Sequence, residues 1–190
     1  LSAVLIIAVL SGSMAVAMES EQPTPPVAFE FSDFGTYPSS DMTCLRLTTF
    51  NAQDEQQATF SSYSRSDDVL LFHDLAISPP VYDFYDNKLF RIRFHIAEDS
   101  GGDPDESLSR LSAILEDYYS MIFAGEDTRT NDRNDSSHKL IFTSNDDIVA
   151  EITWKKYGAC WGAPMIKIQK KDLINKLNKA MNPDYISKVY

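Results

Sequence analysis

The sequence contains 190 residues, of which 43% are hydrophobic, with eleven Phe and nine Tyr. This composition is typical of a folded globular protein and excludes a largely disordered chain. The formal net charge is −11 at pH 7. Such a surface repels phosphate backbones and anionic membranes, so we expect no nucleic-acid partner.

The first 17 residues have the pattern of a secretory signal peptide. An apolar run covers residues 1–10, and Ala15-Val16-Ala17 places small residues where signal peptidase requires them. We expect cleavage between Ala17 and Met18. The mature chain is then expected in the periplasm or outside the cell, with no stable membrane insertion.

An uncleaved membrane anchor is the alternative interpretation of this segment. A spanning helix needs about 20 apolar residues, and the apolar run ends before Glu19. Neither a Met nor a Lys or Arg precedes the run, which we interpret as an N-terminal truncation of a signal peptide.

A single domain is expected over residues 29–190, after a polar, proline-rich and disordered tether at residues 18–28. The clearest element in its first half is a hairpin around Asp86-Asn87, because both residues tolerate the positive φ of a two-residue turn. Alternation of apolar and polar residues then predicts a strand. The predicted strands of this half are 44–50, 58–63, 69–75, 81–85 and 88–96.

A helix is predicted to begin at Asp103, with Pro104 at its first position. Apolar residues at spacings of three and four predict that one face packs on the sheet, and that the helix ends near Gly125. These residues are Leu108, Leu111, Leu115, Tyr118 and Ile122.

The last third of the chain is predicted to begin with a mobile loop, because residues 126–137 are polar and carry both signs of charge. Strands at 139–143, 148–157 and 165–168 and a helix at 172–181 follow. Together the elements predict an α+β fold. It would have a curved antiparallel sheet of about six to eight strands, one long packed helix and a short C-terminal helix.

Cys44 and Cys160 are the only cysteines. In an exported chain an even pair favours a structural disulfide, which would stabilise the fold by at most about 5 kcal/mol. Two free thiols are the alternative. A redox or zinc role lacks its usual Cys-x-x-Cys spacing.

Candidate catalytic residues are weak in this sequence. His73, His95 and His138 lack metal-binding spacings. His73 and Asp74 are neighbours on a predicted strand, so their side chains are expected on opposite faces. We therefore expect no catalytic dyad, no metal and no cofactor.

The acidic pairs Asp67-Asp68, Glu116-Asp117 and Asp146-Asp147 are predicted to lie on turns and solvated helix faces. A glycosidase would need two carboxyls about 5–10 Å apart in a cleft. Calcium binding by the loops 99–105 and 126–135 is a further alternative, although neither has the spacing of a calcium-binding loop.

Aromatic residues occupy both faces of the predicted hairpin. They are predicted to pack a core, while an exposed patch that binds a partner is the alternative. The residues concerned are Tyr82, Phe84, Tyr85, Phe90, Phe94, Tyr118, Tyr119 and Trp161.

The order of several segments resembles that of small uncharacterised exported bacterial proteins. The segments are Phe31-Ser-Asp-Phe-Gly35, Tyr63-Ser-Arg-Ser-Asp-Asp68, the hairpin VYDFYDNKLFRIRF, the strand IVAEITW and the final MIKIQKKDL. The resemblance implies a fold and an extracytoplasmic compartment, and it brings no catalytic residues.

The sequence therefore favours an exported, non-enzymatic protein that binds a protein or a small ligand. The alternative is a cell-envelope hydrolase that uses paired carboxylates.

Overall fold

The structure is a computed structural model, and it describes residues 29–52, 57–97, 104–130, 135–157 and 160–181. The predicted signal peptide, its cleavage site at Ala17 and Met18, and the tether lie outside these residues, so export stays a prediction. Across the described part of the chain, no helix is both long and apolar enough to cross a membrane.

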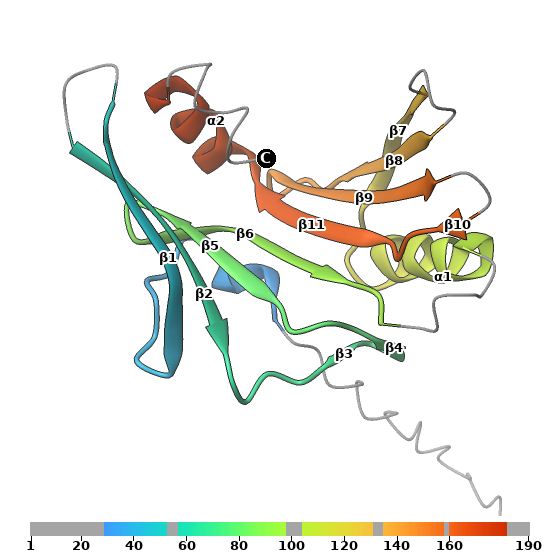
Figure 1. Cartoon of the computed structure of the whole chain (residues 1–190), viewed down its shortest axis with the longest axis horizontal. Coiled ribbons are helices and arrows are strands. Elements are labelled where there is room, and N and C mark those ends of the chain that lie inside the picture. Colours follow the sequence, from blue (N-terminus) through green and yellow to red (C-terminus); the bar gives the residue numbers. More distant parts are fainter. Residues whose placement is uncertain (1–28, 53–56, 98–103, 131–134, 158–159, 182–190) are drawn as a thin grey trace, which may run out of the picture.

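A nine-stranded antiparallel sheet dominates the structure (Figure 1). The strand order is β1-β2-β5-β6-β11-β9-β8-β7, and β10 pairs with β9. The strands are β1 Met42–Asn51, β2 Gln57–Arg65, β5 Val81–Tyr85, β6 Lys88–His95, β7 Ile122–Thr130, β8 Ser136–Thr143, β9 Ile148–Tyr157, β10 Cys160–Trp161 and β11 Met165–Lys170. A separate hairpin consists of β3 Leu71–Phe72 and β4 Leu75–Ala76, and a 3-10 turn covers Phe31–Asp33.

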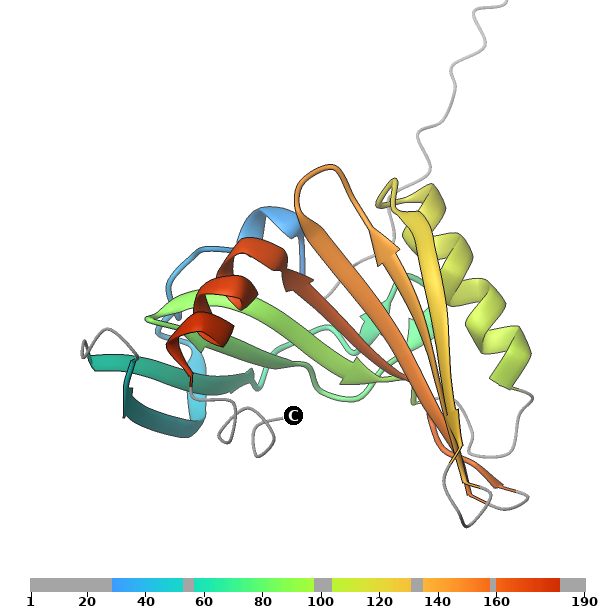
Figure 2. The ribbon, with the colours of Figure 1, turned by 90° about the horizontal axis from the view of Figure 1, so that it is seen from above.

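Two short helices cover opposite faces of this sheet (Figure 2). Helix α1, Pro104–Asp117, follows β6, and helix α2, Lys171–Ala180, follows β11. The buried residues of α1 join the larger core; they are Leu108, Leu111, Ile114 and Leu115. On the other face, Leu173 and Leu177 of α2 pack with Phe60 and Phe90.

The predicted α+β class is wrong, because the structure is 54% strand and 19% helix, and its described residues form two short helices instead of one long packed helix. Helix α1 ends at Asp117 instead of continuing to Gly125. Ser120 adopts a positive φ of 50°, and the N–H of Met121 donates to the carbonyl oxygen of Leu115 at 3.0 Å. The chain therefore turns there, which leaves Tyr118 and Ile122 exposed.

The predicted mobile loop at 126–137 is also wrong where the structure describes it. Residues up to Thr130 belong to β7, and β8 begins at Ser136. Strand β7 lies at the edge of the sheet with most of its side chains exposed. Because no residue of β7 is buried, its polar composition resembles that of a loop.

The predicted hairpin at Asp86-Asn87 is confirmed. Tyr85 pairs with Lys88, and Asp86 and Asn87 have φ values of 47° and 61°. This is the pattern of two positive φ values that joins tightly paired strands.

A buried ion cluster joins three neighbouring strands on the face that carries α2. Asp83 of β5 is fully buried, and its carboxylate accepts bonds from Ser62 Oγ at 2.6 Å and Arg91 Nε at 2.7 Å. Arg93 Nε donates to the same carboxylate at 3.1 Å. Since a buried charge is costly without partners, this cluster makes the central register depend on Asp83.

We expect Asp83→Ala to lower the free energy of unfolding by about 3–5 kcal/mol, because Arg91 would be left buried without its carboxylate. Urea denaturation measures this loss. The control is Asp127→Ala, which removes an exposed pair with Arg129 and should cost less than about 1 kcal/mol. Equal losses for the two variants would contradict the assigned role of Asp83.

The structure does not contain the predicted disulfide. Cys44 on β1 and Cys160 on β10 are both free and exposed. Four strands lie between β1 and β9, the partner of β10, and each step across a sheet is about 4.8 Å. A disulfide requires Cα atoms within about 7 Å, so this strand order separates the two thiols.

We expect the melting temperature of the protein to be the same with and without a reducing agent. Mass spectrometry after treatment of the native, unreduced protein with a thiol reagent should show two adducts, because both thiols are exposed. Labelling of the two cysteines only after reduction would instead support the predicted disulfide and contradict the structure.

Candidate functional site

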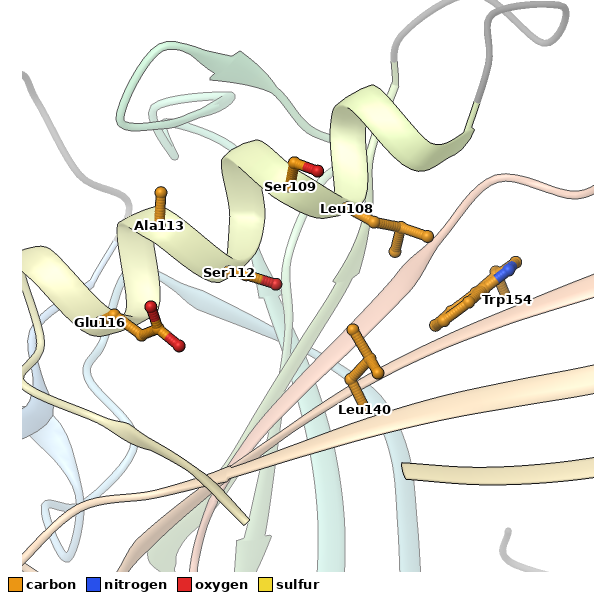
Figure 3. A pocket seen from close by; sticks show the side chains of 7 residues that line it. All are labelled: Leu108, Ser109, Ser112, Ala113, Glu116, Leu140 and Trp154. Carbon is orange, nitrogen blue, oxygen red and sulfur yellow. The ribbon is translucent and has the colours of Figure 1, made fainter. Parts of the chain in front are cut away.

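A groove of about 520 Å³ runs between α1 and the strands β8 and β9 (Figure 3). Its volume lies within the range of ligand pockets in proteins. The lining residues are Leu108, Ser109, Ser112, Ala113 and Glu116 of α1, Leu140 of β8 and Trp154 of β9.

Helical spacing creates one wall of this groove. Leu108, Ser112 and Glu116 are four residues apart, so they lie along the same side of α1. Leu140 and Trp154 face them from the neighbouring strands β8 and β9, as Figure 3 shows. The groove therefore combines an apolar end at Leu108, Leu140 and Trp154 with a polar end at Ser112 and Glu116.

The indole of Trp154 is held in place by His138, its partner in the register of β8 and β9. The two rings stack with centroids 5.2 Å apart. Thr128 Oγ1 lies 3.2 Å from Nδ1 of His138, and Ser136 Oγ lies 2.9 Å from Nε2. With both nitrogens in contact with hydroxyls, the imidazole is a fixed support for the indole.

Glu116 supplies the negative charge of the groove. It is exposed, and no hydrogen bond or ion pair joins it to another described residue. It lies in the last turn of α1, which contains no basic residue. Because the helix macrodipole is negative at that end, Glu116 adds to a potential that attracts cations.

The structure keeps the three histidines apart. His138 supports Trp154, and His95 is exposed near the end of β6. His73 and Asp74 do not lie on a strand, as the sequence predicted, but form the two-residue turn between β3 and β4. The prediction placed them on a strand because Val69–Leu75 is mostly apolar. The turn contains no glycine, so the sequence carries no signal for it.

His73 is buried, with 5% of its surface exposed, and has a positive φ of 56°. Neither ring nitrogen has a hydrogen-bond partner among the described residues. Burial lowers the pKa of the imidazole, while the nearby Asp74 raises it by a smaller amount. The folded protein therefore favours the neutral imidazole.

We expect the free energy of unfolding to fall as the pH drops below about 6.5, because the unfolded chain then binds a proton that folded His73 resists. The slope from this group is at most about 1.4 kcal/mol per pH unit. Urea denaturation between neutral and mildly acidic pH measures it. The control is His73→Asn, which tolerates the positive φ and should remove this part of the slope.

The acidic pairs do not meet in one cleft. Asp68 accepts a hydrogen bond from Tyr82 Oη at 2.9 Å, and Asp146-Asp147 lies in the turn before β9. Glu116 lines the groove, whereas Asp117 and Asp74 line a smaller pocket on the other side of α1. A hydrogen bond from Arg110 lowers the pKa of Asp74, opposite to what a general acid needs.

The predicted calcium loops fall partly outside the described residues. Within the described residues, no group of three or more His, Cys, Asp or Glu side chains could hold a metal ion.

Most of the predicted aromatic residues pack the core. Tyr82, Phe84, Phe90 and Phe94 are buried. Tyr118 and Trp161 are exposed. The sequence did not reveal Trp154 as a site residue, because its strand alternates like any other half-buried strand. The only available signal was the polar series Ser109, Ser112 and Glu116 beside the apolar stripe of α1.

No family model, curated protein or solved structure matches this chain. The geometry of the groove and the pocket is therefore the basis on which a function can be proposed.

Proposed function

We propose that this chain is an exported, non-enzymatic binding protein whose groove between α1 and β8–β9 takes a small organic cation with an apolar body. The observation that carries this proposal is the groove itself. It has an apolar end at Leu108, Leu140 and Trp154 and an unpaired carboxylate at Glu116.

The charge of the groove indicates the charge of the ligand. Of the described residues that line it, Glu116 is the one with an acidic or basic side chain. The C-terminal end of α1 adds the negative end of its dipole, and the net charge of −11 draws cations toward the whole molecule. An ammonium group near Glu116 would neutralise this potential.

The apolar end indicates the body of the ligand. Trp154 is supported by His138 from one side, so its orientation needs little rearrangement on binding. A rigid aromatic wall favours ligands with a flat or apolar part, which gain from burial and from stacking. Ser109 and Ser112 offer hydroxyls between the two ends.

Binding is favoured over the carboxylate hydrolase because the groove contains one carboxylate, whereas that chemistry needs two in one cleft. Asp74 and Asp117 do line the smaller pocket together, but the hydrogen bond from Arg110 lowers the pKa of Asp74, opposite to what a general acid needs.

The test uses 2-phenylethylammonium as the probe and 2-phenylethanol as its uncharged analogue. Binding is followed through the NMR signal of the Trp154 indole N–H, assigned with Trp161→Phe. We expect the amine to shift this signal with a lower Kd than the alcohol. Glu116→Gln should weaken the amine about fivefold, as expected for a partly exposed charge pair.

Asp117→Asn is the matched control, because it removes the same charge from the adjacent residue but lines the other pocket. It should leave the titration of Trp154 by the amine nearly unchanged. Equal affinities of the amine and the alcohol, or equal weakening by the two variants, would contradict the proposal.

A further inference from the structure

A second pocket of about 340 Å³ lies on the other side of α1, against the turn between β3 and β4. It does not share the charged or aromatic residues of the groove. The turn contributes His73 and Asp74 to its lining. Helix α1 contributes Arg110, Ala113, Ile114 and Asp117, and Tyr118 follows directly after the helix.

The turn carries a residue that its backbone disfavours. His73 is the first of two turn residues and has a positive φ of 56°, a conformation that costs about 1–2 kcal/mol for residues other than glycine. Strained residues of this kind concentrate at functional sites. His73 lines the pocket with only 5% of its surface exposed.

The imidazole of His73 also lacks the hydrogen bonds that buried polar groups normally make. Both of its ring nitrogens are buried without a partner among the described residues. A buried polar group in this state is costly, and the nitrogen that is not protonated is an acceptor. The pocket therefore contains an unused acceptor for an N–H group.

Two carboxylates line the pocket, and only one of them pairs with a basic residue among the described residues. Asp74 pairs with Arg110, whose Nη2 lies 2.8 Å from Oδ2. The carboxylate of Asp117 has no hydrogen bond or ion pair with the other described residues, and it stands at the negative end of α1. With His73 neutral, Asp74, Asp117 and Arg110 sum to a charge of −1.

We propose that this pocket is a second binding site, for a small primary ammonium compound that donates N–H groups to the imidazole of His73 and the carboxylate of Asp117. The site is independent of the groove, because the two share only Ala113. An ammonium group suits it for two reasons: it carries the compensating charge, and it has several donors for the two acceptors.

Tyr118 is the movable cover of this site. Its ring lies against the imidazole, with centroids 4.1 Å apart and the ring planes tilted by 39°, yet 59% of its surface is exposed. Exposed side chains change rotamer rapidly, so the ring can swing aside to admit an ammonium group. It can then close over the bound cation, to which the face of an aromatic ring is attractive.

The experiment uses ethylammonium as the probe at neutral pH, with the imidazole nitrogen shifts of His73 as the NMR readout. We expect a saturable shift of one of these nitrogens. Asp117→Asn should weaken binding about tenfold, as for loss of a charged hydrogen-bond partner. Glu116→Gln removes the same charge on the groove side and should leave the Kd unchanged.

Tetramethylammonium tests the role of the N–H donors, because it has the charge but none of the donors. It should not shift the His73 nitrogens. An equal response to both cations, equal effects of Asp117→Asn and Glu116→Gln, or no shift at His73 would overturn the proposal. None of these results bears on the groove, which is followed separately through Trp154 and Glu116→Gln.

Discussion

The whole sheet depends on β11. This last strand pairs with β6 on one side and with β9 on the other, and it joins β1-β2-β5-β6 to β9-β8-β7 in the described part of the chain. Ile166 and Ile168 of β11 are fully buried in the core between the two halves. Most other pairings of the sheet join strands that follow one another closely in the chain, whereas β6 and β11 pair residues at least 70 positions apart, such as His95 and Met165. This long-range pairing is the one expected to form slowly. The larger core contains residues of both halves together with those of β11.

The position of β11 also explains why a groove exists beside α1. Since β11 occupies the place next to β6, the chain that leaves β6 continues to β7 at the far edge. Helix α1 makes this crossing over the face of the second half (Figure 2). Its side chains Leu111 and Leu115 fill the core, while its flanks meet β8 and β9 on one side and the β3–β4 turn on the other. Both candidate sites are therefore consequences of one crossover.

Elements with a strong local signal could be predicted from the sequence. The hairpin at Asp86-Asn87 and strand β9 have such signals, because turn chemistry and alternation act within a few residues. Strand β7 and the turn at His73 could not be predicted, although each pairs with a nearby segment. The exposed strand β7 is polar like a loop, and the turn at His73 contains no glycine or proline. The site was missed because it combines α1 with β8 and β9, so Glu116 and Trp154 line one groove only in the folded chain. The prediction of a disulfide was based on an even number of cysteines in an exported chain. It could not take into account the positions of Cys44 and Cys160 in the sheet.

The turn at His73 has a consequence for attempts to improve this protein. Glycine suits a positive φ better than histidine does, and the buried imidazole has no described hydrogen-bond partner. Selection for thermal stability alone would therefore tend to replace this residue. Such gains commonly come at the expense of activity when the replaced residue belongs to a binding site. In a library of stabilised variants, substitutions at position 73 would therefore raise stability and weaken ligand binding.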